Sequence, residues 1–270
     1  EDVRRDGIDN PPVRKETTPT AISVKGASIS YGSHLALKEV NALVMEGEIV
    51  ALMGRNGAGK SSLLQSIVGV KELDRGEISV FAHPPMSLKG ALRRATVGYI
   101  PQEPGDLLYA QSVAQECAQA DKDNGIASGS TFALLQELVP SVSSATHPRD
   151  LSEGQRLALA LAIVLSAQPQ VLILDEPTRG LDYQSKALLI GLLQNYSKEL
   201  GCCVLIATHD VELVAELADR VIFLADGEIV ADGPTLDILL SSPAFAPQVA
   251  KVMSPRRWLT VSDVIAAMEV

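Results

Sequence analysis

Apolar residues in this chain fall into short, nearly continuous runs that alternate with longer stretches of helical spacing. This alternation is typical of an α/β protein with a mainly parallel sheet, because strands that are covered on both faces are apolar throughout. Shorter runs near the start of the chain predict an additional antiparallel β subdomain. The predicted strands are residues 22–31, 42–53 (interrupted by a turn at 46–48), 76–81, 95–100, 170–174, 202–208, 220–225 and 228–231, and the predicted helices between them are 154–167, 183–200 and 211–219.

Three stretches depart from this pattern. Residues 1–20 combine mixed charges with three prolines and few apolar positions, which predicts a tail or linker that does not pack. Between 101 and 150 the strand signal fades and short helical patches are separated by Gly and Pro, so we expect a helical subdomain over about 102–167. Residues 235–270 predict a C-terminal helical extension, whose last helix begins at a capping box formed by Thr260 and Asp263.

Composition narrows the class of protein. The chain has 270 residues, of which 46% are hydrophobic, and a net charge of −10, which disfavours non-specific attraction to nucleic acid. No apolar run approaches the roughly 20 residues that a membrane-spanning helix needs. Cys117, Cys202 and Cys203 lack the spacing of metal ligands, so we interpret them as small core residues, in keeping with a reducing cytosolic compartment.

The strongest chemical signal is a glycine-rich loop that follows the apolar run 49–52. Its residues fit the pattern G-x-x-x-x-G-K-S, in which backbone N–H groups surround phosphate oxygens at the start of a helix. Lys60 would then bind the β- and γ-phosphates of a nucleotide, and Ser61 would ligate Mg²⁺. An ordinary glycine-rich turn is the alternative, but a strand before the loop and a helix after it favour phosphate binding. The loop and the start of its helix comprise Gly54, Arg55, Asn56, Gly57, Ala58, Gly59, Lys60, Ser61 and Ser62.

A second signal is the apolar run 171–174, which is followed by the two carboxylates Asp175 and Glu176. The C-terminal ends of parallel strands face the ligand crevice of an open sheet. Asp175 suits a contact with Mg²⁺, which prefers oxygen ligands. Glu176 suits the polarisation of an attacking water. Many strands end in acidic residues, so this pair is informative only because it lies downstream of the phosphate loop.

The third signal is the pentapeptide Leu-Ser-Glu-Gly-Gln at 151–155, immediately before an apolar helix. With the loop and the acidic strand, it resembles the signature of ATP-binding-cassette (ABC) ATPases, usually LSGGQ, and the likeness extends over about 21–234. The resemblance implies that Ser152, Gly154 and Gln155 contact the ATP held by a second, facing cassette, and therefore a head-to-tail dimer. A serine that only caps the helix is compatible with the same residues.

Four further positions match this family. The resemblance assigns Gln102 to the glutamine loop near the Mg²⁺ and water site, and His209 to a contact with the γ-phosphate. It assigns Asp182 to the loop that crosses the dimer interface, and Tyr31 to stacking on adenine. Their ordinary alternatives are a solvated Gln, a hydrogen-bonded His, a helix-capping Asp and a core Tyr. The implied cofactors are ATP and Mg²⁺; the implied catalytic residues are Lys60, Gln102, Glu176 and His209, and the implied metal ligands are Ser61, Gln102 and Asp175.

The other histidines, His34, His83 and His147, have no such context, and we assign them no role. Glu153 replaces the usual glycine of the signature, and Arg179 is less usual than the small residues found there in many ABC importers. Arg179, residues 104–108 and the tail 244–270 resemble the ATPases of energy-coupling-factor (ECF) transporters, which import vitamins or transition-metal ions.

Such ATPases work on transmembrane subunits at the cytoplasmic face of the membrane, as homodimers, heterodimers or two fused cassettes. A linker-like start without Met suits the second cassette of a fusion, and a removed tag explains it equally well. Two alternatives stay open: the ATPase of another ABC transporter, importing amino acids or metals or exporting, and a soluble ABC protein acting on ribosomes or DNA. The short 101–150 segment excludes the long coiled coils of chromosome-type ATPases.

Overall fold

The computed structural model describes residues 19–241 and 245–268. Its centre is a six-stranded sheet in which every neighbouring pair is parallel except the last, so the predicted α/β class with a mainly parallel sheet is confirmed. The three middle strands are buried along their whole length, which explains their continuous apolar sequences. In order, the strands are β5 (Val97–Ile100), β6 (Val171–Asp175), β7 (Cys203–Ala207), β3 (Ile49–Met53), β8 (Arg220–Ala225) and β9 (Glu228–Pro234).

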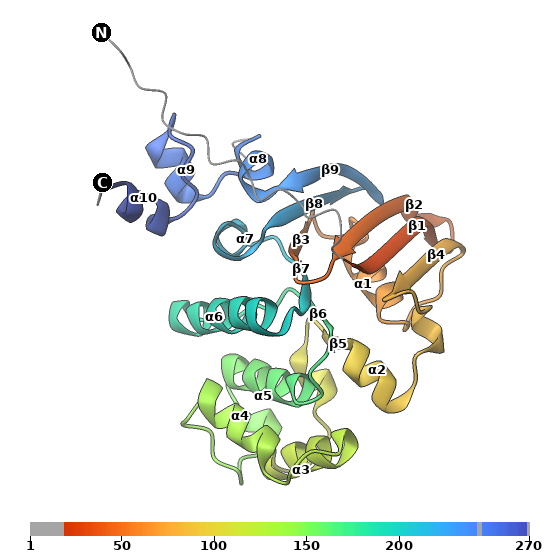
Figure 1. Cartoon of the computed structure of the whole chain (residues 1–270), viewed down its shortest axis with the longest axis vertical. Helices are drawn as coiled ribbons and strands as arrows, with labels where there is room; N and C mark the ends of the chain where they lie inside the picture. Colours follow the sequence, from red (N-terminus) through yellow and green to blue (C-terminus); the bar gives the residue numbers. More distant parts are fainter. Residues whose placement is uncertain (1–18, 242–244, 269–270) are drawn as a thin grey trace.

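A separate three-stranded antiparallel sheet lies beside this core, at the right of Figure 1. It consists of β2 (His34–Met45), β1 (Thr20–Tyr31) and β4 (Arg75–Val80). Helix α1 (Lys60–Ile67) packs between the two sheets, and its buried Leu64 and Ile67 belong to one apolar cluster with residues of both. The phosphate loop, which precedes α1, therefore lies where the two sheets meet.

Helices cover the other face of the central sheet. Helices α5 (Glu153–Leu165), α6 (Tyr183–Leu200) and α7 (Val211–Leu217) supply apolar residues to a cluster with β6 and β7. Helix α5 also packs against α3 (Val113–Asn124) and α4 (Ser130–Leu138), through the buried side chains of Leu159 and Leu135. These three helices form the layer at the bottom of Figure 1. Because α5 contacts a different partner on each side, it is apolar over most of its surface.

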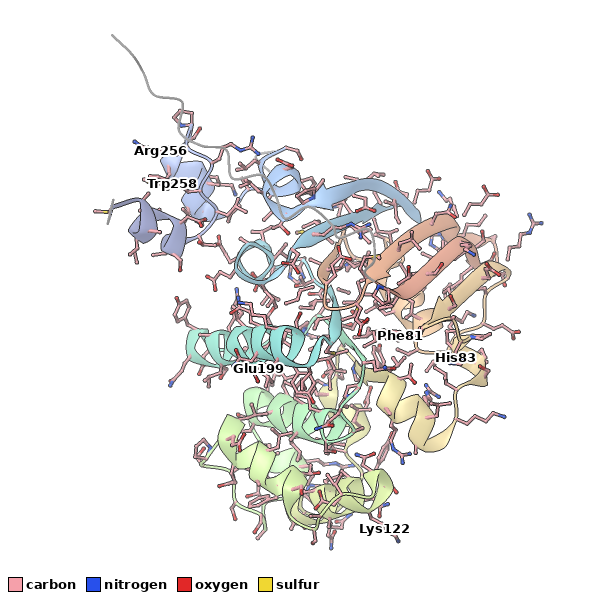
Figure 2. All side chains as sticks on the ribbon, in the orientation of Figure 1. Phe81, His83, Lys122, Glu199, Arg256 and Trp258 are labelled. Carbon is pink, nitrogen blue, oxygen red and sulfur yellow. The ribbon has the colours of Figure 1, made fainter. Side chains whose placement is uncertain are left out.

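The C-terminal extension lies at the opposite end of the molecule from α3 and α4 (Figure 1). It contains α8 (Thr235–Leu240), α9 (Gln248–Met253) and α10 (Val261–Met268). Leu239, Ala250 and Leu259 pack against α7 and β8. The Arg256 guanidinium lies 4.7 Å from the centroid of the Trp258 ring, and both residues are labelled in Figure 2. The predicted capping box is present: Asp263 Oδ2 accepts from Thr260 N at 2.8 Å, and Thr260 Oγ1 accepts from Asp263 N at 3.2 Å.

Several predicted boundaries are wrong. Strand β2 begins at His34, eight residues before the predicted start, because its pairing with β1 includes irregularities that break the simple alternation of polar and apolar residues. Helix α2 (Gly90–Thr96) occupies the first two residues of the strand predicted at 95–100 and was not predicted at all. Thr20 already belongs to β1, and the predicted tail at 1–20 otherwise lies almost entirely outside the described residues.

The three cysteines are free and buried, as expected of small core residues. Among the residues that the structure describes, none of the helices combines the length and the apolar character that a membrane crossing requires.

Candidate functional site

The phosphate loop connects the end of the buried strand β3 to the first residue of α1, Lys60. At Gly59, just before the helix, φ is +104°, and a Cβ atom there would lie 2.3 Å from the backbone oxygen of Ala36. Only glycine fits this position. The Lys60 side chain is buried, and its Nζ donates to the backbone oxygens of Gly54 at 2.8 Å and Arg55 at 3.4 Å. The ammonium group is thereby held inside the loop.

Strand β6 delivers the two carboxylates to the same place. Asp175 accepts a hydrogen bond from the Ser61 side chain, which joins the strand end to the first turn of α1. Burial raises the pKa of Asp175 above its ordinary value, although the Ser61 hydrogen bond opposes the shift. The nearby charge of Glu176 raises this pKa further, while that of Lys60 lowers it. A buried carboxylate of this kind is stabilised by a cation.

Glu176 lies between a lysine and a histidine. Its Oε1 atom is 3.7 Å from Lys60 Nζ, and its Oε2 atom is 2.8 Å from His209 Nδ1. Its φ of 51° is unusual for a residue other than glycine, and its backbone N–H donates to Ala207 at 2.8 Å. Strained backbone of this kind persists where surrounding contacts hold it, and it is concentrated at functional sites.

His209 is positioned by the residues on either side of it. Thr208 is buried at the end of β7, and Asp210 caps α7 by accepting from the N–H groups of Glu212 and Leu213 at 3.1 and 3.0 Å. Asp210 also accepts from Lys186 Nζ at 2.7 Å. The backbone is fixed at both ends, whereas the His209 side chain itself is 75% exposed and remains accessible to a ligand.

A cavity of about 410 Å³ joins these groups. It brings together residues from the first strand of the chain, the phosphate loop, the segment after β5 and the end of β6, which are far apart in the sequence. Its lining includes Tyr31, Asn56, Gly57, Gly59, Lys60, Ser61, Ser62, Gln102, Asp175 and Glu176, all of which were expected at a nucleotide site, together with His34 and Ala36, which were not.

Of the two unexpected residues, His34 has a side chain that can hydrogen-bond to a ligand. In the antiparallel pairing of β1 with β2 it lies directly opposite Tyr31, so both side chains project from the same face of the hairpin. The Tyr31 hydroxyl is 3.3 Å from Ser62 Oγ, and Lys71 Nζ lies 4.6 Å from the centroid of its ring. Recognising that β2 begins at residue 34 would have placed His34 beside the tyrosine.

The other two histidines keep ordinary roles. His147 Nδ1 accepts from the backbone N–H of Arg149 at 3.1 Å and so caps a short 3₁₀ helix, and His83 forms an isolated bridge with Val80 at the end of β4.

The residues expected to act on a facing nucleotide lie outside this cavity. Ser152 caps α5: its Oγ accepts from Gln155 N at 3.2 Å, while Gln155 Oε1 accepts from Ser152 N at 3.0 Å. Asp182 caps α6 by accepting from Ser185 N at 2.7 Å, and hydrogen bonds from Ser185 lower the pKa of Asp182. Both residues therefore cap helices, and at Ser152, which is exposed, the cap coincides with a helix N-terminus of the kind that binds anions.

The donor set suits a hard divalent cation. Ser61 and Asp175 offer a hydroxyl and a carboxylate oxygen that already contact each other, and Gln102 offers an amide oxygen on the same cavity wall. These are the ligand types that Mg²⁺ takes in phosphate sites, where it binds to few protein groups. A phosphate cradle, a buried lysine and this oxygen cluster at the carboxyl end of a parallel sheet define the class of P-loop nucleotide-binding proteins.

Comparison with known proteins identifies the family. A family model described as ABC transporter matches residues 37–179. A putative ABC transporter ATP-binding protein of Streptomyces coelicolor is 53% identical over 253 residues, covering 93% of this chain and 44% of that protein. A similar protein of Streptomyces avermitilis is 51% identical, covering 95% of this chain and 46% of that one. The chain thus spans about half the length of these relatives.

Solved structures agree. The structure of cbiO1 from Clostridium perfringens, described as part of the ABC transporter complex cbiONQ, has a TM-score of 0.71 at 28% identity and covers 93% of this chain and all of its own. A dimeric structure of the ATP-binding cassette MJ0796 bound to ADP and Pi has a TM-score of 0.71 at 25% identity, covering 79% of this chain and 98% of its own. The chain belongs to the ABC transporter family, as an ATP-binding cassette, and this membership implies binding and hydrolysis of ATP.

Proposed function

We propose that this chain is the ATP-hydrolysing cassette of an ABC importer of the energy-coupling-factor type, which takes up a vitamin or a transition-metal ion. The observation that carries the hydrolytic part is the position of Glu176, within 3.7 Å of Lys60 Nζ and 2.8 Å of His209 Nδ1. Arg179 and the C-terminal extension support the ECF type, as does the likeness to cbiO1 over 93% of the chain.

In this proposal each residue acts on the phosphates or the adenine of ATP, or on the attacking water. Hydrolysis requires mainly positioning of the reactants and neutralisation of charge. Lys60 and the loop amides bind the β- and γ-phosphates, and Tyr31 stacks on the adenine. Glu176 orients the water, and the exposed imidazole of His209 contacts the γ-phosphate. Mg²⁺ held by Ser61, Asp175 and Gln102 would neutralise phosphate charge.

A second cassette completes the site. Ser152, Gly154, Gln155 and Asp182 stand apart from the cavity of their own chain, so we propose that they act on ATP bound by a facing cassette. The dimeric form of MJ0796 supports this arrangement. The facing cassette is a second copy of this chain, a similar subunit or a fused neighbour. The same proposal assigns 21–234 to the cassette, 102–167 to its helical subdomain and 235–270 to the extension.

The cassette would work on transmembrane subunits at the cytoplasmic face of the membrane. The test has two arms. The purified chain should hydrolyse ATP in a Mg²⁺-dependent manner, and Lys60→Ala should abolish hydrolysis while Lys251→Ala, an exposed lysine on α9, should not. In the second arm, affinity capture from membranes should recover an ECF transmembrane subunit. Capture of a different transporter subunit would overturn the ECF type. Absence of ATP hydrolysis both by the purified chain and by the assembly captured with it from membranes would overturn the enzymatic function.

A further inference from the structure

Two residues that depart from the usual family pattern, Glu153 and Arg179, line one small crevice. The crevice has a volume of about 30 Å³, and its walls also include Gln102, Glu103 and Glu176. It therefore lies where the segment after β5, the start of α5 and the loop after β6 approach one another. The unusual residues of this chain are not scattered over its surface but gather beside the carboxylate that we assign to catalysis.

Arg179 connects two of these segments directly. Its Nη1 donates to Glu103 Oε1 at 2.9 Å, and its backbone N–H donates to the backbone oxygen of Glu176 at 3.3 Å. One residue is thus attached both to the neighbour of Gln102 and to Glu176. The Arg179 side chain therefore joins the segment after Gln102 to the turn that begins at Glu176.

Glu153 contacts the same loop from the side of α5. A Cβ atom at Gly180 would lie 1.4 Å from Glu153 Oε2, and φ at Gly180 is +73°, so the exposed glutamate side chain approaches a backbone position that favours glycine. The loop after β6 is thus joined to Glu103 by the Arg179 ion pair, and the Glu153 side chain lies beside it at Gly180.

We propose that Arg179 is a positioning residue, whose ion pair with Glu103 sets the placement of Gln102 relative to Glu176 and thereby the rate of ATP hydrolysis. The inference rests on the proposed hydrolytic function. Both side chains of the pair are more than half exposed, at 61% and 63%. Exposed ion pairs contribute little to stability. Its contribution to folding is thus small, whereas a misplacement of about 1 Å near reacting groups costs up to about a hundredfold in rate.

The chain offers a matched control. Lys25 and Glu77 form another ion pair at 2.9 Å, with side chains 67% and 70% exposed, but they lie on the antiparallel sheet and do not line the nucleotide cavity. The experiment compares the wild-type chain with four variants of the same length: R179A, E103A, the charge-reversed double variant E103R/R179E and K25A. Steady-state ATP hydrolysis gives kcat and KM, and thermal unfolding gives Tm.

R179A and E103A should each lower kcat roughly tenfold, with KM for ATP changed less than about twofold and Tm unchanged. E103R/R179E should recover most of the rate, because the pair is restored with reversed polarity. K25A should match the wild type.

An unchanged kcat in R179A would overturn the inference, and so would a low kcat in R179A that the charge reversal fails to recover. Hydrolysis by the wild type with no effect of R179A would leave the proposed function standing. Absence of hydrolysis by the wild type, both alone and in the assembly captured from membranes, would overturn both the inference and the proposed function.

Discussion

The Nδ1 atom of His209 lies 2.8 Å from Oε2 of Glu176, and the other oxygen of that carboxylate lies 3.7 Å from Lys60 Nζ. The Glu176 carboxylate, at the end of β6, therefore contacts both the phosphate loop and the segment after β7. Its own side chain is only 10% exposed, against 75% for His209. The glutamate is the fixed member of this arrangement, and the histidine is the member that is free to follow a ligand.

The first prediction concerns this glutamate. Glu176→Gln keeps the size and most hydrogen bonds of the side chain but removes the charge that orients water, so hydrolysis should fall by about a hundredfold or more. ATP binding should persist, because Lys60 and the loop amides are unchanged. Phosphate release and equilibrium binding of ATP measure the two effects. Turnover close to that of the wild type would contradict the role of Glu176.

The second prediction distinguishes two roles of Ser152, as the cap of α5 and as a contact in the ATP-dependent dimer. Ser152→Ala removes the N-cap of α5 and should cost about 1 kcal/mol of stability. Ser112 caps α3 in the same way, with Oγ accepting from Gln115 N at 3.3 Å, and Ser112→Ala should cost a similar amount. Only Ser152→Ala should also weaken the ATP-dependent dimer, as measured by sedimentation with ATP and the Glu176→Gln background. Equal dimerisation of the two variants would leave Ser152 as a cap alone.

The third prediction uses the buried charge of Asp175. Because burial raises its pKa, the folded chain holds this proton more tightly than the unfolded chain, and ionisation of Asp175 lowers stability as pH rises through the raised pKa. Asp175→Asn should therefore raise Tm at neutral pH in the absence of Mg²⁺. The gain should disappear at acidic pH, below the ordinary aspartate range, where the carboxyl is protonated in both states. It should be absent in Asp106→Asn, which changes an exposed aspartate.

The same substitution should lower Mg²⁺-dependent hydrolysis, since it removes a charged oxygen ligand. A Tm for Asp175→Asn below that of the wild type at neutral pH would show that the carboxylate is stabilised by contacts stronger than its burial cost.

The fourth prediction concerns the cysteines. Burial raises the pKa of Cys117 and of Cys202 to about 12, and it raises the pKa of Cys203 well above its ordinary value. The thiolate is the reactive form, so the native chain should resist labelling by a maleimide at pH 8, while the unfolded chain should react at all three positions. Mass spectrometry after timed labelling measures this. Rapid labelling of the native chain would show that β7 or α3 opens far more readily than its burial implies.

The antiparallel sheet shows why part of the fold escaped prediction from sequence. Residues 34–41 form the first two thirds of β2 but contain polar residues that interrupt the alternation, including Glu39 at a φ of 52°. Their strand conformation follows from pairing with β1, which is a contact between segments rather than a property of either one. The prediction of a strand from 42 onward included only the last four residues of β2. For that reason His34 was not placed beside Tyr31.

The sequence by itself determined the elements whose burial is uniform and whose loops need particular residues. The continuous apolar runs of β3, β6 and β7 allow only buried strands, and the glycines of the phosphate loop allow backbone that other residues cannot adopt. Local sterics and hydrophobic burial are enough to fix these parts.

Only the tertiary structure decided which of these parts meet. Three relationships join segments that are distant in the chain: the ion pair of Arg179 with Glu103, the approach of Glu153 to Gly180, and the position of His34 in the nucleotide cavity. Their contacts depend on how the two sheets and the helical layer pack, and no local pattern of residues carries that information.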